Sequence, residues 1–83
     1  MSKLYVGNLP FKFASEDLAE MFAVAGQVVS ALVITDRDTK RSKGFGFVEF
    51  ASEEESNKAI EMLNGKEVEG RKLVVNPARP QVR

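Results

Sequence analysis

The sequence KGFGFVEF at residues 43–50 decides the fold of this chain. Aromatic and β-branched residues favour a strand, and successive side chains of a strand point to opposite faces. Phe45 and Phe47 therefore share one face with Glu49, while Val48 and the final phenylalanine share the other. A carboxylate prefers water, so a strand buried on both faces is disfavoured, and the face with Glu49 is expected to be exposed. Neighbouring exposed phenylalanines indicate a surface that binds another molecule.

This octapeptide resembles the longer signature of the RNA recognition motif family, whose pattern is [KR]-G-[FY]-[GA]-F-V-x-[FY]. Residues 43–50 match every defined position of that pattern. A second segment, LYVGNL at residues 4–9, is similar to the family's shorter signature. The short segment alone is weak evidence, since many amphipathic strands would fit it, but the two together are specific. A short chain of this kind is also similar to the single-motif RNA-binding proteins of bacteria, including cyanobacteria.

Apolar periodicity and capping residues predict the element order strand–helix–strand–strand–helix–strand. The strands are expected at residues 3–7, 27–34, 43–50 and 71–76, and the helices at 15–25 and 52–64. Ser15 is the expected N-cap of the first helix, and Ser52 with Glu55 forms a capping box for the second. Gly26 and Gly65 are the expected stops. This order is typical of an α+β, ferredoxin-like βαββαβ sandwich, with a four-stranded antiparallel sheet and two helices packed on one face.

The side chains expected in the core follow the same periodicities. They are Leu4, Val6, Leu18, Met21, Phe22, Ala25, Val48, Phe50, Ala59, Ile60, Leu63, Leu73 and Val75. The strand at 27–34 is apolar nearly throughout, so its pattern does not determine which side chains face inward. The resemblance implies that Ala31 and Val33 point inward and that Leu32 and Ile34 lie beside the exposed aromatic rings. It also implies one domain over residues 1–79, followed by a short flexible tail at 80–83.

The resemblance assigns the binding residues. Tyr5 and Phe47 each correspond to a position that stacks one base, and Phe45 to a position that packs against the sugars between them. Base–aromatic stacking tolerates every base, so these rings would supply affinity more than specificity. Lys43, Arg37, Lys40 and Arg41 are expected to meet phosphates, with Lys3, Lys72 and Arg79 around the rim and Asn76 at a base edge.

The polar connection at residues 35–42 has two alternative roles. It starts as a calcium loop does, with Asp36 and Asp38, but Arg41 occupies the glycine position and Phe47 the position of the bidentate glutamate, so calcium binding is rejected. It is then either a basic clamp over bound RNA or a plain hairpin connection. The residues alone leave this choice open.

Charge is divided unevenly along the chain, although its formal net charge is zero, with 12 basic and 12 acidic residues. The predicted helices at 15–25 and 52–64 hold seven of the acids and a single base, Lys58, which leaves five acids and eleven bases elsewhere. Local potential, more than net charge, attracts a phosphate backbone. A basic strand-and-loop side is therefore expected opposite an acidic helical side, although the acidic segments are also explained as ordinary solvated helices.

Composition narrows the classes of activity. The chain has no cysteine and no histidine, which removes disulfides, the usual nucleophile–base pairs and most zinc sites. We identify no convergent carboxylate pair, and the chain is predicted to be neither an enzyme nor a cofactor-binding protein. With 43% hydrophobic and 29% charged residues, no membrane-spanning run and no signal-like segment, it is expected to be cytoplasmic.

The predicted function is binding of single-stranded RNA in post-transcriptional RNA handling, with single-stranded DNA as an alternative ligand. A flat platform of two stacked bases does not fit a duplex, whose bases are already stacked. The chain is expected to be a monomer, with the acidic helical face free for a protein partner. A protein-interaction module that uses the same fold without RNA is the alternative function, although loss of the aromatic residues would favour it and all three are present.

Overall fold

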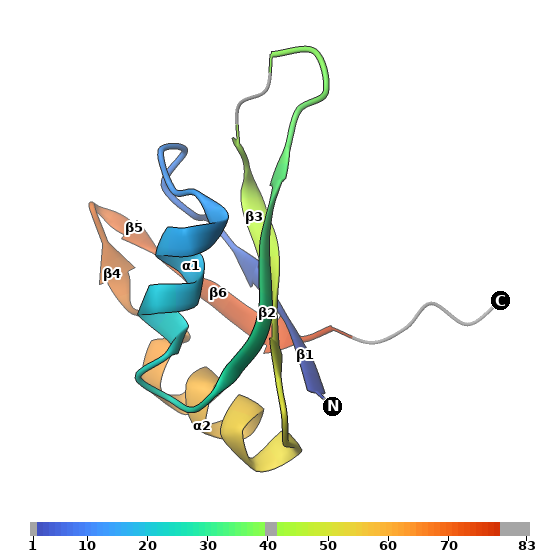
Figure 1. The fold of residues 1–83 in the computed structure, drawn as a ribbon. Helices are drawn as coiled ribbons and strands as arrows, with labels where there is room; N and C mark the ends of the chain where they lie inside the picture. The colour runs from blue at the N-terminus through green and yellow to red at the C-terminus, as the bar shows by residue number, and fades with distance from the viewer. Residues whose placement is uncertain (1, 40–41, 79–83) are drawn as a thin grey trace, which may run out of the picture.

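The computed structural model describes residues 2–39 and 42–78, and for Ser42 and Lys43 the backbone only. Its elements, in chain order, are β1 (Ser2–Gly7), α1 (Ser15–Phe22), β2 (Val28–Thr35), β3 (Ser42–Phe50), α2 (Glu53–Leu63), β4 (Glu67–Val68), β5 (Arg71–Lys72) and β6 (Val74–Pro77). Four strands form a sheet in the order β2-β3-β1-β6, with antiparallel neighbours throughout. Both helices cover the same face of this sheet (Figure 1), which confirms the predicted ferredoxin-like sandwich.

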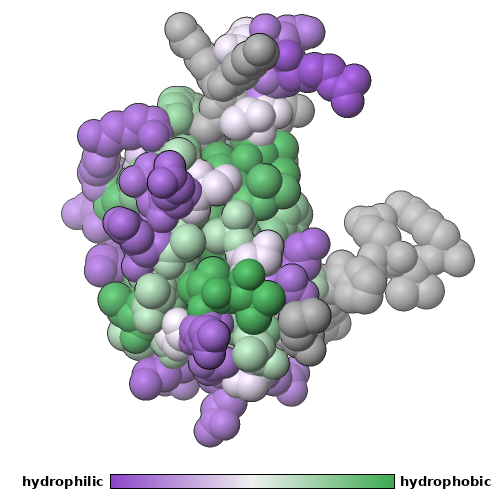
Figure 2. Space-filling model, viewed as in Figure 1, coloured by the Kyte–Doolittle hydropathy of each residue, from purple (hydrophilic) through white to green (hydrophobic). Residues whose placement is uncertain are grey.

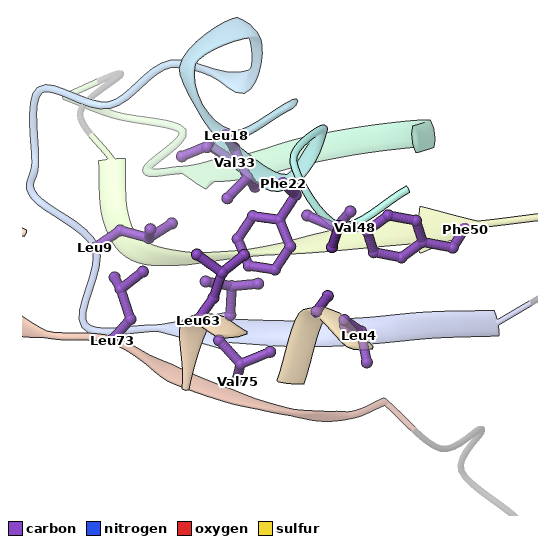
Figure 3. Packing of buried hydrophobic residues seen from close by; sticks show 13 residues of the cluster. Leu4, Leu9, Leu18, Phe22, Val33, Val48, Phe50, Leu63, Leu73 and Val75 are labelled. Atoms are coloured by element: carbon purple, nitrogen blue, oxygen red, sulfur yellow. The ribbon is translucent and has the colours of Figure 1, made fainter. Parts of the chain in front are cut away.

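The core lies between the helices and the inner face of the sheet. Alternate side chains of the two central strands enter it, as the pairing of Leu4 on β1 with Val48 on β3 shows. Phe22 from α1 and Phe50 from β3 are both fully buried, with ring centroids 6.5 Å apart (Figure 3). The residues expected in the core are buried, except that Met21, Ala31 and Ile60 are only partly buried and pack against its edge. The predicted inward face of each element is therefore confirmed.

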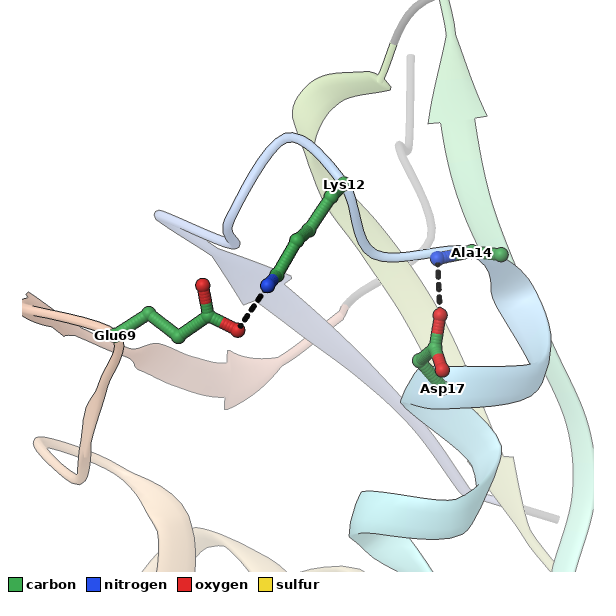
Figure 4. Close-up of polar contacts among 4 residues, drawn as sticks. All are labelled: Lys12, Ala14, Asp17 and Glu69. Carbon is green, nitrogen blue, oxygen red and sulfur yellow. Dashed lines mark hydrogen bonds and ion pairs between the residues drawn. The ribbon is translucent and has the colours of Figure 1, made fainter.

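Helix α1 begins at the predicted residue but with a different cap, and it ends earlier than expected. Ala14, not Ser15, is the N-cap, and Asp17 Oδ2 accepts a hydrogen bond of 2.8 Å from the Ala14 main-chain N–H (Figure 4). The Ser15 hydroxyl instead accepts a 3.0 Å bond from the main-chain N–H of Val33, which ties α1 to β2. The helix ends at Phe22, because the next turn tightens and the Ala25 N–H bonds to the carbonyl only three residues back.

Helix α2 has Ser52 as its N-cap, as predicted, and Ser52 is bonded to Glu55 in the first turn. The Ser52 hydroxyl accepts a bond from the Glu55 main-chain N–H at 3.3 Å and donates to Glu55 Oε1 at 3.1 Å. Glu55 Oε2 also accepts a 2.8 Å bond from the main-chain N–H of Gln27. That bond first, and those with Ser52 second, lower the pKa of the Glu55 carboxyl below its ordinary value.

In the described part of the chain, no helix has the length and apolar character needed to cross a membrane.

The C-terminal segment differs from the single strand predicted at residues 71–76. Residues 67–72 form a small hairpin, β4 and β5, whose turn has Glu69 and Gly70 at φ values of 50° and 82°. Leu73 then donates its N–H to the Lys66 carbonyl at 2.9 Å, and β6 begins one residue later. Lys72 therefore belongs to the hairpin, and its expected place on the main sheet is wrong.

Candidate nucleic-acid interface

The face of the sheet away from the helices carries side chains arranged in rows across the strands. The pairing of β2, β3, β1 and β6 aligns one row in the order Leu32, Phe47, Tyr5 and Asn76. A second row aligns Ser30, Glu49 and Lys3. Both rows follow from the alternation that buries Val48 and Phe50, because each strand residue between two inward residues must point outward.

Three aromatic rings form the centre of this face. The Tyr5 centroid lies 5.9 Å from that of Phe45 and 6.0 Å from that of Phe47, and the two phenylalanine centroids are 6.5 Å apart. The Phe45 and Phe47 planes are nearly perpendicular, at 88°. We call Tyr5, Phe45 and Phe47 the platform. The edge-to-face contacts of Phe47 with Tyr5 and with Phe45 hold the rings in place while leaving part of the ring surface open to solvent.

The Tyr5 ring leans along β1 over Gly7. A Cβ atom at Gly7 would lie 2.8 Å from Tyr5 Oη and 2.9 Å from its Cε2, closer than real Cβ contacts. Gly7 also pairs with Phe45 across β1 and β3. The missing side chain at this position therefore leaves room for the tyrosine ring beside Phe45.

Apolar surface continues from the platform onto the edge strand β2. Leu32, which pairs with Phe47, is 54% exposed, and Val29 is 49% exposed. Figure 2 shows hydrophobic side chains reaching the surface among hydrophilic ones on the side of the molecule where β2 runs in front. The expected outward orientation of Leu32 and the inward orientation of Val33 are both confirmed.

The second row borders an open hollow of about 90 Å³ beside Phe47. Its walls are Lys3, Ser30, Leu32, Phe47 and Glu49. The Lys3 Nζ lies 4.9 Å from the centroid of the Phe47 ring, in a cation–π contact. A cation, an anion and a hydroxyl therefore meet beside one aromatic ring of the platform.

The remaining predicted binding residues are placed as follows. Asn76 lies beside Tyr5 in the first row, as expected, whereas Lys72 lies on β5 outside the main sheet. Arg37 is exposed in the β2–β3 connection, where Asp36 Oδ1 accepts main-chain bonds from Asp38 and Thr39 and so shapes a turn. Lys40, Arg41, Arg79 and the Lys43 side chain lie outside the described part of the structure.

Several contacts outside the platform were not predicted from the sequence. Phe11 is 60% exposed, and the Arg71 guanidinium lies 4.8 Å from its ring centroid. Arg71 Nη1 donates to Asn8 Oδ1 at 3.1 Å, and Lys12 Nζ lies 3.1 Å from Glu69 Oε2 (Figure 4). These contacts join the β1–α1 connection to the β4–β5 hairpin, and no local pattern predicts contacts between segments so far apart. Ser30, in contrast, has the same strand parity as Leu32 and could have been predicted from it.

The family model described as "RNA recognition motif" matches residues 4–74. The 28 kDa ribonucleoprotein, chloroplastic, of Spinacia oleracea is 52% identical over 80 residues, which cover 96% of this chain and 34% of that protein. A crystal structure of RNA Binding Protein PG1 is 48% identical, with a TM-score of 0.90, covering 98% of this chain and all of that chain. The Rna15 RRM with bound RNA (GU) is 29% identical, with a TM-score of 0.85, covering 94% and 83%.

The chain spans about a third of the length of its spinach relative. Further relatives from Arabidopsis thaliana and Nicotiana sylvestris, 49–53% identical, also carry chloroplastic names. The predicted cytoplasmic location is therefore wrong, because these names point to the chloroplast. Composition could not have revealed this, since a reducing compartment and a soluble domain fit either location.

Proposed function

This chain belongs to the RNA recognition motif family, and from that premise we propose that it binds single-stranded RNA on the uncovered face of its sheet. The observation that carries the proposal is the direct cross-strand pairing of Tyr5 with Phe47, with their centroids 6.0 Å apart. Two partly exposed rings at neighbouring positions offer stacking surfaces for two successive unpaired bases. Phe45, at 5.9 Å from Tyr5, packs against the sugars between them.

The ligand is single-stranded because the platform is a stacking surface. A base that stacks on Tyr5 or Phe47 must leave its own neighbours, which a duplex resists and a single strand allows. Stacking supplies about 1–3 kcal/mol per base, whichever base it is. Two rings therefore support modest affinity for a few nucleotides, and single-stranded DNA is the natural comparison ligand.

Phosphate contacts are assigned to the basic residues to which the family resemblance gives this role. We propose this role for Lys3, Arg37, Lys40, Arg41, Lys43, Lys72 and Arg79, and base-edge contact for Asn76. Lys3 is supported by its position beside Phe47, and Asn76 by its pairing with Tyr5. Lys72 lies on the β4–β5 hairpin, outside the main sheet. Each phosphate contact lowers the logarithm of affinity by about 0.7 per tenfold increase in salt.

The function proposed is binding without catalysis. It is supported by the relatives, whose names describe ribonucleoproteins and RNA-binding proteins. The exposed carboxylates of α1 and α2 lie on the opposite side from the platform, so a protein partner there would leave the RNA site open. We expect the chain to act as a monomer.

The test is an NMR titration of the labelled protein with a pool of short random RNA oligonucleotides. We expect shifts at Tyr5, Phe45 and Phe47 and in the 35–43 connection, weaker shifts with the DNA pool, and none at α2. A silent platform would refute the proposal. Shifts confined to the helices on addition of a candidate protein would then favour the protein-interaction module.

A further inference from the structure

The hollow beside Phe47 contains a carboxylate that stacking does not use. Glu49 lies between Lys3 on β1 and Ser30 on β2 in the same row, one pleat away from the ring. Within the part of the chain that the structure describes, the Glu49 side chain has neither a hydrogen bond nor an ion pair, and the Lys3 ammonium lies over Phe47 instead. This partly buried anion is placed where negatively charged RNA is proposed to bind.

A carboxylate at this position repels phosphate, so its favourable partner is a group that donates hydrogen bonds. An ionised glutamate only accepts hydrogen bonds, through two oxygens. Unpaired bases differ in the donors on their Watson–Crick edge. Guanine carries two adjacent N–H donors, at N1 and N2, which match two carboxylate oxygens. Adenine and cytosine offer one amino group each, and uracil offers one N–H between two carbonyl oxygens that the carboxylate repels.

The neighbours of Glu49 fit this arrangement. Phe47 and the row of Ser30, Glu49 and Lys3 line the same hollow, so the edge of a base stacked on Phe47 can reach this row. Stacking displaces the Lys3 ammonium from the ring, and the displaced cation remains opposite Glu49 across the strands. There it offsets the repulsion between the carboxylate and the RNA phosphates.

We propose that Glu49 is a specificity-determining residue that selects guanine for the base stacked on Phe47. This inference rests on the proposed RNA-binding function and adds base identity to it. Paired hydrogen bonds to one base edge discriminate against the wrong base by about 5- to 150-fold. Guanine is therefore expected to bind more tightly than uracil by a factor in that range, with adenine and cytosine between them.

The experiment measures the affinity of four oligouridylates that differ only in one central nucleotide, G, A, C or U, by fluorescence anisotropy. The variant is Glu49→Gln, and the matched control is Glu61→Gln, which removes the same charge from an exposed position on α2. Glutamine offers one acceptor and one donor, so Glu49→Gln is expected to reduce the guanine-over-uracil ratio at least fivefold and to strengthen uracil binding. The control is expected to leave the ratio unchanged.

Three other outcomes are informative. If Glu49→Gln changes all four affinities by the same factor, the carboxylate acts only through its charge and the inference is overturned. Wild-type binding without a guanine preference overturns the inference but leaves the proposed function standing. No binding of any oligonucleotide by the wild type overturns both. Thermal unfolding of the Glu49→Gln variant, expected to match the wild type, shows that the fold is retained.

Discussion

Replacing Phe47 with alanine is expected to weaken RNA binding while leaving the domain folded. Replacing Phe50 with alanine is expected to destabilise the fold without removing a stacking surface. The two phenylalanines lie three residues apart on β3, but they point to opposite faces of the sheet. Phe47 contributes one stacking surface, worth about 1–3 kcal/mol, which corresponds to about a 5- to 150-fold loss of affinity. Phe50 has 0% of its surface exposed and fills the core beside Phe22.

The stability changes should differ as clearly as the affinities. Phe47 contributes cross-strand contacts with Tyr5 and Leu32, so its removal costs about 1 kcal/mol. Removal of a buried phenylalanine costs about 3–5 kcal/mol, out of a total of about 4–12 kcal/mol for a domain of this size. At about 4–8 °C per kcal/mol, Phe50→Ala should lower Tm by at least about 12 °C, and Phe47→Ala by about 4–8 °C.

The assay combines thermal unfolding by circular dichroism with anisotropy titration of a short RNA. A Phe45→Ala, Phe47→Ala double variant extends the test to both phenylalanines of the platform and is expected to stay folded with little residual binding. An unfolded double variant would mean that the platform is part of the core. Full RNA affinity in a folded Phe47→Ala variant would refute the stacking mechanism.

Three further changes test other parts of the structure. Gly7→Ala should push the Tyr5 ring off the sheet, lower RNA affinity several-fold and alter the fluorescence of this single tyrosine, with the fold retained. Glu55→Gln should weaken the pH dependence of stability on the acidic side, as measured by urea unfolding across the acidic range. The pKa of the Glu55 carboxyl is lowered in the folded state, so the carboxylate stabilises the fold above its unfolded-state pKa. This contribution is lost as pH falls through the folded-state pKa. Asn64→Ala should cost about 1–3 kcal/mol in urea unfolding, because Asn64 Oδ1 accepts the 3.0 Å bond from the N–H of buried Val75.

Each of these three predictions has an outcome that would contradict it. An unchanged tyrosine signal and unchanged affinity in Gly7→Ala would show that the ring position does not depend on the glycine. An identical acid slope for wild type and Glu55→Gln would show that this carboxyl does not titrate with folding. An Asn64→Ala variant with unchanged stability would mean that water replaces the lost acceptor. The control is Lys12→Met, which removes only an exposed ion pair and is expected to change stability by less than about 1 kcal/mol.

The sequence predicts the main sheet and the platform well because both depend on the two-residue period of strands. Phe45 and Phe47 alternate with buried residues on β3, and Tyr5 alternates with Leu4 and Val6 on β1. That alternation determines which side chains share a face without any knowledge of distant contacts. The role of those side chains in RNA binding remains a prediction.

The parts that the sequence predicts poorly depend on tertiary contacts. Ser15 has the composition of an N-cap, but its hydroxyl bonds to β2 instead. The β4–β5 hairpin interrupts the last predicted strand, because the Leu73 N–H donates a hydrogen bond to the Lys66 carbonyl. On β2, which is apolar nearly throughout, strand parity with Leu32 is enough to turn Ser30 outward. The pairing shifts between Val28 and Ser30, however, so the sequence does not predict that Ser30 pairs with Glu49.

The alternation along β3 makes binding and folding inseparable at the level of single insertions. One extra residue between Phe45 and Phe50 would turn outward-facing residues inward beyond that point, removing side chains from the core and the platform together. Insertions in the 36–41 connection avoid this penalty, because they lengthen a turn without changing which residues pair. Variants of this sequence can therefore differ in the length of that connection, whereas the spacing within β3 is constrained both by stability and by binding.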